Sequence, residues 1–254
     1  MSLLNDKNQI FDKLLSDYEA EFAQFSTVLK RLLSEFIMTG PHTKEEVVAF
    51  FSGTGLTEVA QGFVNKYDDV IEYTKQVSLQ TGIPLVLPES SLNVLALYKE
   101  NQVQNILGAS ESIMKAVTDA SLRYGIGESK IGTIVAELNT IVDEAGRRIV
   151  TEALTGASIY DRTLKYEQFT NSGVELYFYS GPLDNVTRAV CQETLSDPRQ
   201  YSGWTIEDIQ SSSTPFSVCG GYNCRHEWLP MVKGTYDLVR EMQREAGVER
   251  QVNI

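Results

Sequence analysis

The stretch Phe11–Phe36, FDKLLSDYEAEFAQFSTVLKRLLSEF, decides the first part of the fold. Its apolar residues recur at alternating steps of four and three, at Phe11, Leu15, Tyr18, Phe22, Phe25, Leu29, Leu32 and Phe36. This heptad spacing predicts one long amphipathic helix that ends at Gly40-Pro41, because proline cannot continue the helical hydrogen-bond ladder. The seam suits packing inside a helical bundle, or self-association in which Phe11, Leu15, Phe22, Phe25, Leu29 and Leu32 bind a partner.

Helical periodicity continues to about residue 168. Thr43 and Glu46 form a capping box, which predicts the start of a short helix that ends near Phe51. Further helices are predicted over residues 56–79, 91–123, 129–155 and 159–169, with an interruption at Gly156 between the last two. Residues 1–168 are therefore expected to form a helical bundle domain.

The pattern changes after residue 168. Residues 174–179 are β-branched and aromatic, which predicts a strand, and a second strand is predicted over residues 224–232. Between them we expect a helix to about Leu195, capped by Asp184 or Asn185, and a long polar loop. With a terminal helix over residues 236–246, residues 169–254 form a small α+β domain. The fold class is thus α+β and predominantly α-helical.

Composition limits the function. The 254 residues include 22 Lys and Arg against 34 Asp and Glu, a formal net charge of −12. This balance argues against dedicated nucleic-acid binding, because phosphate contacts require a basic surface. The N-terminus lacks the pattern of a signal peptide, and no stretch approaches the roughly 18 apolar residues of a membrane span. Three cysteines, an odd number, favour a reducing compartment. We expect a protein that folds in a cytoplasm without contacting a membrane.

The reactive side chains gather near the C-terminus. Cys191, Cys219, Cys224 and His226 form a Cys3His set, which is a legitimate tetrahedral zinc site. The alternative is that these residues bind no cofactor and simply pack in the core. A nucleophile formed by Cys224, His226 and Asp184 is a further alternative.

Two ordered units in the same region resemble a known family. The first is YSGPLDNVTRAVC, residues 179–191, and the second is GGYNCRHEW, residues 220–228. Together they resemble the C-terminal domain of tailed-phage minor head proteins, the Mu F-like head morphogenesis family, over about residues 145–232. The preceding helix also fits, because Arg147–Glu152 and Tyr160–Arg162 resemble the helical lead-in of that domain. In the two units, the residues that carry the resemblance are Asp184, Thr187, Arg188, Cys191, Asn223, Cys224 and Arg225. In that family, Pro and His often precede the second unit and a further Cys follows it, so here Cys219 and His226 would take their places.

The resemblance implies a structural virion protein without enzymatic activity. Such a protein would associate with portal or capsid proteins in several copies and assist head assembly and genome packaging or ejection. It would be located in the virion, and in the host cytoplasm during assembly. A scaffolding adaptor that acts through the helical domain, or a Cys/His-dependent enzyme, remains as an alternative.

Overall fold

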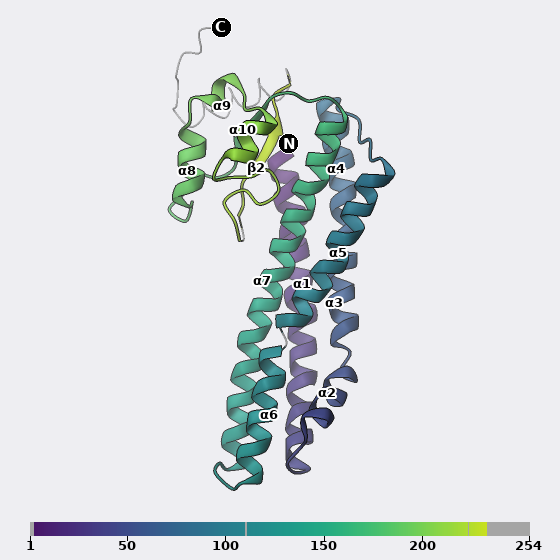
Figure 1. Ribbon diagram of the computed structural model, residues 1–254, viewed down its shortest axis with the longest axis vertical. Coiled ribbons are helices and arrows are strands. Elements are labelled where there is room, and N and C mark those ends of the chain that lie inside the picture. Colours follow the sequence, from purple (N-terminus) through teal and green to yellow (C-terminus); the bar gives the residue numbers. More distant parts are fainter. Residues whose placement is uncertain (1–2, 110, 223, 233–254) are drawn as a thin grey trace. The chain divides into compact units, whose positions relative to one another are not determined.

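The computed structural model describes residues 3–109, 111–222 and 224–232. This part of the chain is predominantly helical and carries a small two-stranded antiparallel sheet, which confirms the predicted fold class (Figure 1). In chain order the elements are α1 (Leu3–Met38), α2 (Lys44–Ser52), α3 (Leu56–Asn65), α4 (Asp68–Thr81), α5 (Glu89–Ala109), α6 (Glu111–Gly125), α7 (Ile131–Asn171), β1 (Tyr177–Ser180), α8 (Ala189–Ser196), α9 (Arg199–Ser202), α10 (Ile206–Ser211) and β2 (Glu227–Pro230). The predicted terminal helix over residues 236–246 lies outside the described residues.

The chain divides into two compact units whose boundaries differ from the predicted division after residue 168. The first unit contains residues 1–67 and 97–156, and the second contains residues 68–96 together with residues 157 onward. Hydrogen bonds at the end of α7 show why. The Gln168 amide Nε2 donates to Ser78 Oγ (2.6 Å) and to the Ile83 carbonyl (3.0 Å), so the segment after α4 packs with the C-terminal residues.

In the first unit, the apolar stripe of α1 packs inside a helical bundle. Its buried apolar residues are Leu14, Tyr18, Phe22, Phe25, Leu29, Leu33 and Ile37. The steps are mostly four, so the stripe departs from the predicted heptads and Leu32 is only half-buried. Phe22, Phe25 and Leu29 therefore serve packing within the chain, as in the first of the two alternatives. The side chains of Phe11 and Leu15 lie outside the described part.

The helix interruption predicted at Gly156 does not occur. The glycine lies inside α7, where a Cβ would overlap the Tyr67 hydroxyl and the Gln102 amide. Tyr67 in turn donates to the Ala153 carbonyl at 2.9 Å. The prediction of a break was wrong, because this glycine permits a close approach and the helix continues through it.

Two other predicted helices each correspond to two described helices. The segment 56–79 breaks at Lys66 and Tyr67 into α3 and α4. The segment 91–123 is described as α5 and α6, on either side of residue 110, which lies outside the described residues. The capping box of α2 is confirmed: Thr43 Oγ1 accepts from the Glu46 N–H, and Glu46 accepts from the Thr43 N–H. None of the described helices is alone long and apolar enough to cross a membrane; α2 together with Leu56–Gln76 passes that test only as a pair bent by 42°.

Gly146 provides a test of the packing between α7 and α1. A Cβ at Gly146 would overlap the Phe22 ring, whereas a Cβ at Gly62, within α3, meets nothing within 4 Å. We expect Gly146→Ala to lower the free energy of unfolding by about 1–3 kcal/mol through overpacking. Gly62→Ala should raise it by up to about 1 kcal/mol through helix propensity. Chemical denaturation followed by circular dichroism measures both, and equal gains in the two variants would contradict the packing.

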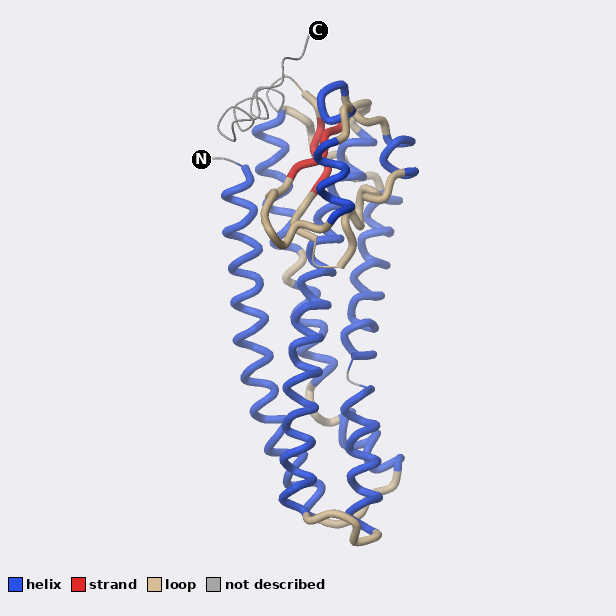
Figure 2. Tube along the Cα trace, turned by 90° about the vertical axis from the view of Figure 1, so that its left-hand side faces the viewer, coloured by secondary structure: helices blue, strands red, loops and turns tan. Residues whose placement is uncertain are grey.

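The second unit is built around its sheet, which Figure 2 shows in red among short helices and loops. β1 and β2 are antiparallel with Tyr179 opposite Trp228, and Tyr177 also forms a bridge with Trp204. Both strands are shorter than predicted. The core around them contains Ile83, Phe169, Tyr177, Tyr179, Cys191, Trp204, Ile209, Phe216, Cys219, Cys224 and Trp228. The sulfur atoms thus belong to an aromatic core.

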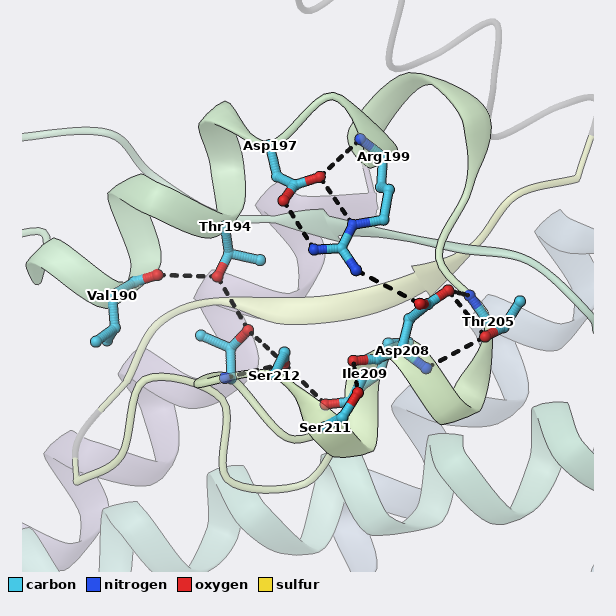
Figure 3. Close-up of polar contacts among 10 residues, drawn as sticks. Val190, Thr194, Asp197, Arg199, Thr205, Asp208, Ile209, Ser211 and Ser212 are labelled. Carbon is cyan, nitrogen blue, oxygen red and sulfur yellow. Dashed lines mark hydrogen bonds and ion pairs between the residues drawn. The ribbon is translucent and has the colours of Figure 1, made fainter.

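Polar contacts join the short helices α8, α9 and α10 and the loops between them (Figure 3). Arg199 bonds Asp197 through Nε (3.0 Å) and reaches Asp208 through Nη1 (3.4 Å). Asp208 completes a capping box with Thr205 at the start of α10. The Arg199 guanidinium also stacks over the Trp204 ring, 3.7 Å from its centroid. The loop after α8 is therefore pinned by charge and stacking.

This network makes the second unit sensitive to acid. Arg199 lowers the pKa of Asp197, and the Thr205 backbone N–H lowers that of Asp208, both from an ordinary 3.8. Because the folded-state pKa values lie below the unfolded ones, the stabilisation is complete above about pH 3.8 and is lost as pH falls through the folded-state values. Fluorescence of the chain's two tryptophans, Trp204 and Trp228, should report this acid transition.

Asp208→Asn is the control for the acid transition. It removes one titrating group, so its unfolding midpoint in denaturant should change less with pH below 3.8 than that of the wild type. Identical pH profiles for the two proteins would contradict the assignment.

Candidate metal centre

Three donor side chains meet in the core of the second unit. Cys191 lies on α8, and Cys224 and His226 lie just before β2. Their ligand atoms are all within 4.8 Å of one another, and the side chains are 1%, 5% and 2% exposed. The cluster of Cys191, Cys224 and His226, called here the Cys2His cluster, could hold a metal ion.

The measured separations match those of ligands on one metal. A tetrahedral zinc ion with Zn–S of about 2.3 Å and Zn–N of about 2.0 Å separates two sulfurs by about 3.8 Å, and a sulfur and a nitrogen by about 3.6 Å. Cys191 Sγ and Cys224 Sγ are 3.8 Å apart, and Cys224 Sγ and His226 Nδ1 are 3.6 Å apart. Two of the three edges thus match a tetrahedral site, and the third, between Cys191 and His226, is within 4.8 Å.

The orientation of His226 also suits a ligand. Its Nε2 lies 2.9 Å from the Pro182 carbonyl, which can only accept a hydrogen bond. In the neutral imidazole Nε2 therefore carries the proton, and the Nδ1 lone pair faces Cys224. A backbone carbonyl that orients a histidine in this way is a common outer contact of metal sites. Gly181 makes room for the ring, because a Cβ there would overlap it.

The two thiols differ in their acidity. Burial opposes ionisation of Cys224, but hydrogen bonding from the His226 backbone N–H, the Arg162 charge and the Gly220 N–H outweigh it and lower the pKa of the thiol to about 6. Burial raises the pKa of the Cys191 thiol. The Gly220 N–H lies 3.3 Å from Cys224 Sγ, and a Cβ at Gly220 would overlap Cys191 Sγ. One thiolate is therefore already favoured in this core.

Cys219, the fourth predicted ligand, does not join the cluster. Its thiol donates to the Phe216 carbonyl at 3.3 Å. Among the described residues it is the one non-glycine residue with a positive φ, 51°. The backbone turns there so that Gly220 and Cys224 can approach Cys191, which directs the Cys219 side chain elsewhere.

The two units of the sequence motif pair with each other. Both carboxylate oxygens of Asp184 accept from Arg225 Nη2, at 2.9 and 2.8 Å. Arg188 donates to the carbonyls of Gly220 and Tyr222. The Arg225 guanidinium lowers the pKa of Asp184. Asn223 lies outside the described residues.

Thr187 and Asp184 shape the first unit of the motif. Thr187 Oγ1 accepts from the Asp184 N–H (2.9 Å) and donates to the Pro182 carbonyl (2.9 Å). Asp184 was predicted to cap α8, but the cap is Arg188, which makes no side-chain cap bond. Asp184 also pairs with Arg225 and not with His226, so it does not orient that ring as the nucleophile hypothesis required.

Charged residues of α7 support the cluster, and sequence reasoning gave them no role there, although Asp161 and Arg162 lie in a stretch that carries the resemblance. Arg162 donates to the carbonyls of Ser217 (3.2 Å) and Cys224. Lys165 Nζ contacts Asp161 Oδ2 (3.1 Å) and Glu227 Oε2 (2.5 Å). Lys165 was missed altogether, because a charged residue at a helical position is more often exposed to solvent.

Lys165, Asp161 and Glu227 form a buried ion triad. The Lys165 side chain is 1% exposed and its partners are 0% and 3% exposed. Burial alone would lower the pKa of Lys165, but the two carboxylates raise it above its ordinary value. The triad therefore ties α7 to the first residue of β2, next to His226.

Comparisons with known proteins assign no family. No family model matches the chain, and no solved structure matches it. A stretch of 176 residues, 68% of the chain, is 23% identical to the non-reducing polyketide synthase nscA of Trichophyton verrucosum. The chain spans 8% of that enzyme's length. The similarity does not carry the enzyme's activity to this chain.

Lys165→Met tests whether the triad is essential. The change removes the cation that two buried carboxylates share, which should lower the free energy of unfolding by about 3–5 kcal/mol. Lys75→Met is the matched control, since its partner Glu72 and its own side chain are more than half exposed. The control should change stability by no more than about 0.5 kcal/mol. Denaturation followed by tryptophan fluorescence measures both, and similar small effects would show that the triad is dispensable.

Proposed function

We propose that this chain is a structural, non-enzymatic component of a tailed-phage head. In this role it associates with portal or capsid proteins, in several copies, and assists head assembly and genome packaging or ejection. The observation that supports the proposal is the pairing of the two motif units. Asp184 binds Arg225, Arg188 binds the carbonyls of Gly220 and Tyr222, and Cys191 lies beside Cys224. The residues that resemble the Mu F-like domain thus contact one another.

Burial favours a structural role over catalysis for the same residues. Cys224 and His226 are 5% and 2% exposed and lie among aromatic side chains. A nucleophile must reach its substrate, and this pair would do so only if the core opened. Asp184, the third group of the enzyme hypothesis, is engaged by Arg225. The motif is therefore better suited to holding a fold than to attacking a substrate.

Zinc is the metal we assign to the Cys2His cluster. Two thiolates and an imidazole are the donors that zinc prefers, and two thiolates neutralise its charge inside an apolar core. Bound there, zinc would join α8 to the segment before β2, a link between residues that lie 33 positions apart. Its role would be to stabilise the fold.

Charge supports contact through proteins. With a net charge of −12, the chain has little to attract it to packaged DNA. Protein partners, such as the portal, are consistent with this balance. The proposal places the chain in the virion, and in the host cytoplasm during assembly.

Quantitative mass spectrometry of purified particles from the encoding phage tests the proposal. We expect the chain in the particles at a fixed ratio to the portal protein. A particle population that lacks the chain, or that carries it at a variable ratio, would overturn the structural role. Arg225→Ala, which breaks the pairing of the motif units, should reduce incorporation, whereas the exposed change Lys75→Met should not.

A further inference from the structure

The Cys2His cluster supplies three corners of a tetrahedron, and the fourth needs a donor. Structural zinc sites are closed by four protein ligands. Cys219 was the predicted fourth ligand, but its thiol is directed to the Phe216 carbonyl. The donor at the remaining corner must come from another side chain in the same core.

The hydroxyl of Tyr179 lies where a fourth ligand would lie. A tetrahedral zinc ion with Zn–O of about 2.0 Å separates an oxygen and a thiolate sulfur by about 3.5 Å. Tyr179 Oη is 3.4 Å from Cys191 Sγ and 3.9 Å from Cys224 Sγ. Both distances are close to the 3.5 Å expected between an oxygen and a sulfur that bind the same zinc ion. The Tyr179 hydroxyl is thus near both cysteine ligands of the site.

Tyr179 is held firmly in this position. Its backbone N–H donates to Gln200 Oε1 (2.7 Å), and its carbonyl accepts from Gln200 Nε2 (2.6 Å). Its ring stacks on His226 with centroids 5.3 Å apart and planes 10° apart. The side chain is 1% exposed. A ligand oxygen at this position would therefore be held in place by the strand, Gln200 and the His226 ring.

The contacts of the Tyr179 hydroxyl differ from those of its neighbour on β1. The described partners of Tyr179 Oη are the two sulfurs of the cluster. Tyr177, two residues away on the same strand, donates instead to the Val174 carbonyl at 3.0 Å. The Tyr179 hydroxyl is therefore directed to the candidate ligands.

We propose that Tyr179 Oη is the fourth ligand of the metal bound by Cys191, Cys224 and His226, and that Cys219 is not a ligand. The proposal rests on the zinc assignment made above. It defines a site with two sulfur, one nitrogen and one oxygen donors. Cys219 then has a separate task, which is to turn the backbone before Gly220.

Cobalt substitution of the full chain tests the composition of the site. Co2+ takes the place of zinc, and the intensity of its thiolate charge-transfer band counts the sulfur ligands. We expect the intensity of two thiolates in the wild type and in Cys219→Ala. An intensity of three thiolates that falls to two in Cys219→Ala would overturn the proposal.

Tyr179→Phe tests the oxygen ligand, and Tyr177→Phe is its matched control. Tyr179→Phe should shift the ligand-field bands of bound Co2+ and weaken binding more than about tenfold. Tyr177→Phe should leave both unchanged, since its hydroxyl contacts the Val174 carbonyl. Unchanged bands in Tyr179→Phe would overturn the role of Tyr179. Circular dichroism of the apo variants establishes that each is folded.

Two failures are distinguishable in these experiments. If wild-type protein binds neither Co2+ nor Zn2+, the zinc assignment fails and the fourth ligand fails with it. If the wild type binds and Cys191→Ala abolishes binding, but Tyr179→Phe behaves as wild type, only the present inference fails. Neither result bears on whether the chain is found in phage particles.

Discussion

The second unit depends on two cations that α7 places inside the core. Arg162 and Lys165 lie one turn apart on one helix face and are 2% and 1% exposed. A buried charge without a partner is costly, so each cation requires acceptors that are not on the helix alone. Arg162 donates hydrogen bonds to carbonyls of the loop before β2, and Lys165 forms an ion pair with Glu227 at the start of that strand. The helix thereby dictates where the C-terminal segment lies.

The position of the sulfur atoms follows from this constraint. Once the Cys224 carbonyl is bound to Arg162 and Glu227 is bound to Lys165, Cys224 and His226 are held on either side of Arg225. Arg225 points outward and is available to Asp184. That pair fixes the loop before α8, and α8 carries Cys191 to Cys224. The ion triad, the motif pairing and the Cys2His cluster are thus successive links of one arrangement.

Features set by neighbours in the sequence could be predicted. The helix of α1 and the capping box of Thr43 and Glu46 are such features, and so is the existence of the two strands. Features that depend on contacts between distant parts of the chain could not be predicted. The sequence suggested that Gly156 breaks the helix, but Gly156 lies within α7, and Tyr67 and Gln102 occupy the space that a side chain would fill.

The metal site illustrates the same limit. Residue type nominated Cys191, Cys219, Cys224 and His226 as candidate ligands, because thiols and imidazoles are few in this chain. Residue type could not show that the backbone at Cys219 adopts φ 51° and directs that thiol away. Nor could it separate Tyr179 from the other aromatic residues of its strand. Residue type suggests candidate ligands, and the tertiary fold determines which of them lie close together.

A metal would add a connection that the sheet itself does not provide. The sheet has two strands of four residues each, and an isolated pair of that size is marginal in water. The packing and ion pairs around it supply most of its stability, and a metal would further join α8 to the segment before β2. Cys191 and Cys224 hold their sulfurs 3.8 Å apart, the spacing of two ligands on one metal and well beyond the roughly 2.0 Å of a disulfide. A reduced pair at this separation, beside an oriented histidine, favours a metal as the cross-link.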